Sequence, residues 1–217
     1  MKKLIFTLLL NLFFTFSYGQ INTELIKKNV IDHPRENFYD LLDIFKVNPS
    51  ELTQEQLNQL YYGSKFIKTE YTIGNYNSEW RTFWKPAQKR LSKSKAEKML
   101  AEAEIKYLKN PLNKDLLKDM ANIYRALNQN EKADLCNKQM DLITQTIEKS
   151  GDGKSEETAI CVLTGSEVLQ QLDRLVQTGS PGPFDQKMKQ LSDGSILTIY
   201  RIGSREVYVK LVGGFFL

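Results

Sequence analysis

The apolar residues in the first two thirds of the chain recur at intervals of three and four, which is the period of one helix face. A first helix is predicted to begin at Pro34, because proline suits a first turn, and to end at the Asn-Pro-Ser run at 48–50. A second helix follows Thr53, which forms a capping-box pattern with Gln56. The predicted core-facing positions are Phe38, Leu41, Leu42 and Phe45 in the first helix and Leu57, Leu60, Tyr61, Ser64 and Ile67 in the second.

Three more helices are predicted before residue 150. Ser94 and Glu97 make another capping-box pattern at the start of the third, and Asn110-Pro111 ends it. Asn113 can cap the fourth helix, and the turn at 128–130 separates it from the fifth. The core-facing positions are Ala96, Met99, Leu100, Ala103 and Tyr107 in the third helix, Leu117, Met120, Ala121, Tyr124 and Leu127 in the fourth, and Ala133, Cys136, Met140, Ile143 and Ile147 in the fifth.

The fourth and fifth helices resemble one tetratricopeptide repeat. Ala121 and Ala133 stand twelve positions apart, where that repeat uses small residues so that two antiparallel helices can approach closely. Tyr124 takes the aromatic position, and Asn128 occupies the turn, where asparagine tolerates the left-handed conformation. Asn137 departs from the usual bulky apolar residue, and no second clean copy is present. Because a lone repeat cannot bury its own face, the earlier helices are expected to stack on it as degenerate neighbours.

The pattern changes after residue 150. An apolar run at 158–164 predicts a buried strand, 166–177 a helix, and 196–202 and 206–212 two further strands. Gly203-Ser204 between the last two fits a two-residue II′ hairpin turn. The predicted fold class is α+β, a mainly helical, tetratricopeptide-like body over 20–150 followed by a small βαββ C-terminal unit over 151–217.

Residues 1–19 have the layout of a secretory signal peptide. Lys2 and Lys3 form a positive start, 4–16 is a mostly apolar run, and Ser17 and Gly19 place small residues before a cut at Gln20. The apolar run is shorter than the roughly 20 residues of a membrane span, and Gln20 is not the cysteine of a lipoprotein. We therefore expect export to the periplasm, the cell surface or the extracellular medium, and no stable membrane insertion after cleavage.

Charge and cysteine content add little to this picture. Removing Lys2 and Lys3 from the 30 basic residues leaves 28 against 26 acidic ones, too weak an excess to indicate a nucleic-acid partner. Cys136 and Cys161 are expected to enter an oxidising compartment. The sequence allows either a disulfide between them or two separate buried thiols.

Several kinds of catalytic or cofactor site are disfavoured. One histidine, His33, and two cysteines cannot build the common zinc sites, and any Ser-His-Asp or Cys-His arrangement would have to use His33. The run Gly151-Asp152-Gly153-Lys154-Ser155 imitates the end of a phosphate-binding loop, but Glu148 stands where that loop needs glycine, and a helix precedes it instead of a strand. Carboxylates scatter over helix faces without forming an evident pair. No catalytic residue, metal or cofactor is predicted.

One stretch stands out as a possible binding surface. Six basic residues and no acidic one lie between Arg81 and Lys95, beside three aromatic side chains that could stack on sugar rings. The alternative is that the aromatic residues cover the core while the lysines form a solvated face. The partner-binding candidates are Trp80, Trp84, Lys85, Lys89, Arg90 and Lys93.

Several short motifs resemble a family of exported proteins of unknown function, about 200 residues long, from Bacteroidetes-type bacteria. The motifs are Phe38-Tyr39-Asp40-Leu41-Leu42, Leu60-Tyr61-Tyr62-Gly63, Asn110-Pro111-Leu112-Asn113, Gly151-Asp152-Gly153-Lys154-Ser155 and Thr158-Ala159. The resemblance covers about 35–170, so it implies nothing about the C-terminal hairpin, and it implies no activity.

These observations favour a non-catalytic module that binds a protein or peptide, because stacked helix pairs expose grooves that hold peptides. The alternative is a module that binds envelope glycan or another anionic polymer through the aromatic-basic stretch. An enzyme of unknown type is the third possibility.

Overall fold

The computed structural model describes residues 21–67, 91–176 and 185–214. The predicted signal segment at 1–19 lies outside these ranges, so export stays a prediction. Within them, no helix has both the length and the apolar character needed to cross a bilayer.

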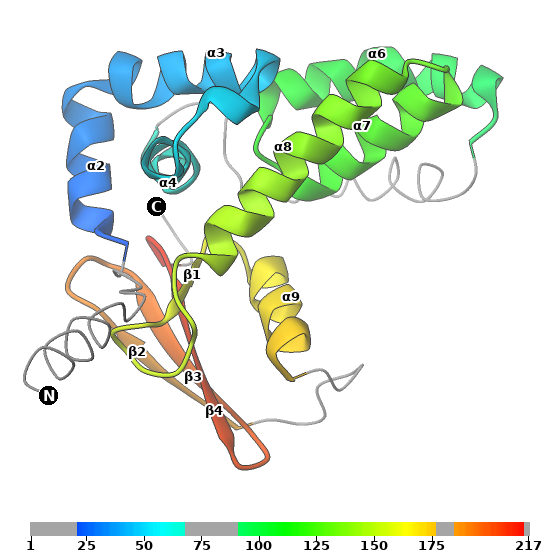
Figure 1. Cartoon of the computed structure of the whole chain (residues 1–217). Coiled ribbons are helices and arrows are strands. Elements are labelled where there is room, and N and C mark those ends of the chain that lie inside the picture. The colour runs from blue at the N-terminus through cyan, green and yellow to red at the C-terminus, as the bar shows by residue number, and fades with distance from the viewer. Residues whose placement is uncertain (1–20, 68–90, 177–184, 215–217) are drawn as a thin grey trace, which may run out of the picture.

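The N-terminal part contains one helix more than the apolar pattern predicted (Figure 1). Helix α2 (Thr23–Asp32) is capped by the Asn22 side chain, which accepts a hydrogen bond from the Leu25 amide. The pattern is blurred there because Leu25 and Ile31 point to solvent while Ile26 and Val30 are buried. The elements that follow are the π-helical turn η1 (Arg35–Tyr39), α3 (Asp40–Val47), η2 (Pro49–Glu51), α4 (Gln54–Gly63) and η3 (Ser64–Phe66).

The helix starts show which local signals were correct. At α4 both hydrogen bonds of the predicted Thr53–Gln56 capping box are present. Helix α6 (Lys93–Lys109) begins one residue before the predicted cap, Ser94, so that prediction is wrong; Ser92 holds the N-cap position without a side-chain bond. Asn113 caps α7 (Lys114–Ala126) as predicted, by accepting from the Leu116 amide.

Helices α7 and α8 (Asn130–Glu148) form a hairpin of packed helices (Figure 1). Asn128 in the turn has a φ of 61°, the left-handed conformation that the sequence predicted. Ala121 and Ala133 are both buried, which is consistent with close approach of the two helices. The likeness of this pair to a tetratricopeptide repeat stays a prediction.

The C-terminal part is a four-stranded mixed sheet and one helix, so the α+β class is confirmed. Its elements are β1 (Ile160–Val162), α9 (Gly165–Val176), β2 (Asp185–Gln190), β3 (Ile196–Ile202) and β4 (Arg205–Leu211), and the strand order is β1-β4-β3-β2. Strand β1 runs parallel to β4, and the other pairs are antiparallel.

The βαββ prediction therefore missed one strand. All six residues of β2 are exposed, and Met188 is its single apolar side chain, so its sequence carries no alternating pattern. The β3–β4 hairpin is confirmed, because Ile202 pairs with Arg205 across Gly203-Ser204 and Gly203 has a φ of 61°.

Buried residues of the helices and the sheet form one continuous core. The Tyr62 hydroxyl of α4 donates to the carbonyl of Cys161 in β1 at 3.0 Å, and the Tyr61 hydroxyl donates to the Glu167 carboxylate of α9 at 2.5 Å. Cys136 and Cys161 are free and buried, so the structure contains no disulfide between them. The Gly151–Ser155 run connects a helix to a strand, as the sequence predicted.

Candidate functional site

The predicted aromatic-basic surface falls almost entirely outside the described residues. Trp80, Trp84, Lys85, Lys89 and Arg90 belong to that part of the chain. Of the six candidates only Lys93 is described, as the exposed first residue of α6. The stretch therefore stays a hypothesis, and the described residues place a candidate site elsewhere.

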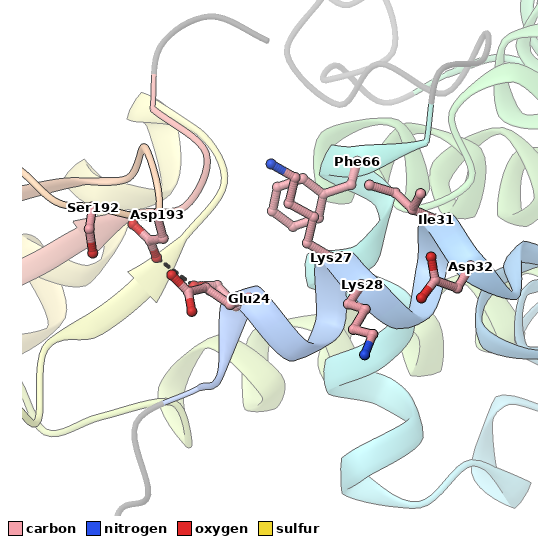
Figure 2. A pocket seen from close by; sticks show the side chains of 9 residues that line it. Glu24, Lys27, Lys28, Ile31, Asp32, Phe66, Ser192 and Asp193 are labelled. Atoms are coloured by element: carbon pink, nitrogen blue, oxygen red, sulfur yellow. Dashed lines mark hydrogen bonds between the residues drawn. The ribbon is translucent and has the colours of Figure 1, made fainter.

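A pocket of about 410 Å³ lies where the N-terminal helix meets the sheet (Figure 2). Phe66 of η3 and the β2–β3 turn residues Ser192 and Asp193 form two of its walls. The third wall is one face of α2, made of Thr23, Glu24, Lys27, Lys28, Ile31 and Asp32. Its volume is in the range of small-molecule sites, roughly 300–1,000 Å³.

A buried ion pair fixes α2 to the sheet at one end of this pocket. The Lys210 ammonium of β4 lies 2.8 Å from Asp193 Oδ2, with both side chains about nine-tenths buried. Thr23 Oγ1 donates to the same carboxylate oxygen at 2.6 Å, and the Ser195 amide donates to the other oxygen at 2.9 Å.

The ion pair also decides how Asp193 behaves chemically. Burial alone would raise the pKa of Asp193, but hydrogen bonds from Lys210 and Thr23 hold that pKa well below its usual range. The carboxylate is therefore ionised at neutral pH and already neutralised by Lys210. It is a structural tie between α2 and the sheet and has little capacity left for a ligand.

The charged side chains of α2 remain open to solvent. Glu24, Lys27, Lys28 and Asp32 share one helix face and are exposed. Among the described residues, no ion pair involves any of the four, and the Lys27 ammonium lies 5.7 Å from the centre of the Phe66 ring. Ile31, 57 % exposed, continues the apolar surface of that ring along the helix. The wall thus presents charges of both signs around an apolar patch.

Catalytic groups are sparse in this region. His33 caps the C-terminal end of α2, is exposed, and is not among the pocket-lining residues. Burial raises the pKa of the Cys136 and Cys161 thiols to about 11, so both are protonated at neutral pH and weakly nucleophilic. Over the described ranges there is no group of three or more side chains suited to hold a metal ion.

The model of the family described as "Domain of unknown function (DUF4919)" matches residues 24–184. The chain belongs to the DUF4919 family. A search of curated proteins finds no match, and neither does a search of solved structures. The expectation of a family of unknown function is confirmed.

The region that matches the DUF4919 model contains only part of the pocket lining. It includes α2 and Phe66 but ends at residue 184, before the turn residues Ser192 and Asp193 and before Lys210. None of the pocket residues was singled out from the sequence. A spacing pattern was present in the acidic and basic residues of α2, but this part of the chain was not recognised as a helix, and its neighbours lie far away in sequence.

Proposed function

We propose that this DUF4919 protein is an exported, non-catalytic module that binds peptides, and that the pocket between α2, Phe66 and the β2–β3 turn receives them. The observation that carries the proposal is the pocket wall, where solvent-exposed charges of both signs surround an apolar patch of Phe66 and Ile31. A peptide offers both charges and an apolar side chain within a short length. The helix hairpin of α7 and α8 would add a further, tetratricopeptide-like surface.

The glycan alternative receives less support from this pocket. An anionic polymer would be attracted by Lys27 and Lys28 but repelled by Glu24 and Asp32, so the wall has no net charge to favour it. That alternative still rests on the stretch from Trp80 to Lys93. An enzyme of unknown type remains third, because Lys210 already neutralises Asp193, the carboxylate beside the Thr23 hydroxyl.

A binding assay on residues 20–217 separates the first two candidates. An array of short peptides and a polyanionic glycan such as polygalacturonate are each probed at low and high salt. We expect peptide binding that changes little with salt, because apolar contact contributes much of it, whereas binding of polyanions through lysines is screened. The proposal would be overturned if the protein bound the glycan at low salt and bound no peptide at either salt concentration.

Two matched variants locate the binding site. Ile31→Asp places a charge in the apolar patch, and Leu108→Asp does the same at an equally exposed position on α6. We expect Ile31→Asp to abolish peptide binding and Leu108→Asp to leave it unchanged. Equal effects of the two variants would mean that peptides bind elsewhere.

A further inference from the structure

The charges in the pocket are arranged in order along α2 (Figure 2). Glu24 lies in the first turn of the helix and faces Asp193 across the pocket. Lys27 follows one turn later with its ammonium beside the Phe66 ring, and Lys28, whose side chain points away from that ring, also lines the pocket. An acidic end and a basic middle therefore stand one helical turn apart, a rise of about 5 Å.

Each charge in this arrangement selects against one kind of ligand. A simple anion would meet Glu24, and a simple cation would meet the two lysines. Asp193 cannot serve as the acidic site, because Lys210 already neutralises it. A ligand that carries an ammonium and a carboxylate satisfies both groups at once.

The spacing of Glu24 and Lys27 along the helix favours a short ligand. An extended peptide gains at most about 3.5 Å per residue, so two or three residues bridge one helical turn together with the hydrogen bonds at each end. The pocket volume, about 410 Å³, also fits a ligand of this size better than a long chain.

We infer that the pocket binds a peptide of two or three residues whose two ends are both free. Its terminal ammonium is held by Glu24, its terminal carboxylate by Lys27, and an apolar side chain lies on Phe66 and Ile31. The inference rests on the proposed function, because it names the ligand of the same pocket.

Calorimetric titration of residues 20–217 tests this assignment. The ligands are Ala-Leu-Ala, its N-acetylated form and its C-terminal amide. Loss of a charge-assisted hydrogen bond costs roughly tenfold or more in affinity, so each blocked peptide should bind at least tenfold more weakly. Binding of all three peptides with equal affinity would overturn the ligand assignment and leave peptide binding intact. Failure of these ligands and of every arrayed peptide to bind would overturn both proposals.

Variants of the two charged positions make the test specific. The Glu24→Gln variant should bind the free and the N-acetylated peptide with equal affinity. The Lys27→Met variant should bind the free peptide and its amide with nearly equal affinity. Lys118→Met, on the exposed surface of α7, should retain both preferences. Because all three side chains are exposed, the thermal midpoints should change little. If the blocked peptides are still discriminated in both pocket variants, Glu24 and Lys27 do not hold the peptide ends and the inference is wrong.

Discussion

Asp119 is a fully buried carboxyl on α7, and neither of its oxygens has a hydrogen-bond partner among the residues that the structure describes. Burial raises the pKa of Asp119 to about 7; the nearby charge of Asp115 adds to the effect, and that of Lys118 opposes it. A carboxyl whose pKa is higher in the folded than in the unfolded state binds more protons when folded. Its contribution to stability is complete below about pH 4 and is lost as the pH rises to about 7.

Replacing Asp119 should remove this pH dependence. We expect Asp119→Asn to be more stable than the parent at pH 8, by on the order of 3 kcal/mol, and to lose that advantage near pH 4.5. Urea titrations at the two pH values measure the difference. Asp134→Asn on the exposed face of α8 is the control, and its free energy of unfolding should equal that of the parent at both pH values. If the free energy of unfolding changed equally with pH in the Asp119 variant and in the parent, the carboxyl would not be protonated in the folded state.

Lys210 is a second buried ionisable residue, and it forms an ion pair with Asp193. Lys210→Met leaves the Asp193 carboxylate without its cation, which should cost roughly 3–5 kcal/mol at neutral pH. Because the Asp193 pKa is depressed in the folded state, this contribution is present above about pH 4 and is lost at lower pH. Denaturant titration compares the stability lost in Lys210→Met with that lost in Lys187→Met on β2, where the lysine is exposed. A loss no larger than in the control would mean that the pair does not hold α2 to the sheet.

At the scale of elements, the hairpin of α7 and α8 depends on two small residues. Ala121 is 1 % exposed and Ala133 is fully buried, and the two helices that carry them pack against each other. Ala121→Leu should overpack the interface and cost roughly 1–3 kcal/mol, whereas Lys118→Ala on the exposed side should cost under about 0.5 kcal/mol. Equal midpoints in a denaturant titration would contradict the close packing of this pair.

The elements also show how far local sequence signals reach. The capping pairs at Thr53 and Asn113 and the turn residue Asn128 were predicted correctly because each acts within four residues. The Ser94 cap failed because the Ser-x-x-Glu pattern is short enough to occur without a helix start. Helix α2 and strand β2 were missed because few of their residues face the core, and a single weak face gives no clear period.

At the scale of the molecule, the region that matches the family model ends before most of the sheet. Strand β1 lies inside the matched region, but its partner β4 lies beyond residue 184. Strand β4 and the residue after it bury Val207, Val209, Leu211 and Val212, which together stabilise the fold by roughly 6–12 kcal/mol. That is comparable with the whole stability of a typical domain.

A truncated chain tests this dependence. We expect residues 20–184 to lack the cooperative thermal transition of residues 20–217, because β1 and α9 lose the surface against which they pack. Circular dichroism during heating is the measurement. A sharp transition at the midpoint of the longer chain would show that the matched region folds without the hairpin.

Export can be tested on the whole chain. Cleavage after Gly19 predicts a mature protein that begins at Gln20. Intact-mass measurement of protein recovered from outside the cytoplasm should give the mass of residues 20–217. A mass that still includes residues 1–19 would contradict the signal assignment and the exported setting of the proposed function.

The sequence alone determined those features that neighbouring residues create together. The helical periods, the caps at α4 and α7, the left-handed turn at Asn128 and the β3–β4 hairpin all depend on residues close along the chain. Long-range packing decided the rest. Thr23 and Asp193 meet across 170 positions of sequence, and β1 skips two strands to pair with β4. No local pattern encodes such contacts, because they form when buried apolar surfaces bring distant segments together. The candidate pocket depends on one of them and could therefore be located only in the folded chain.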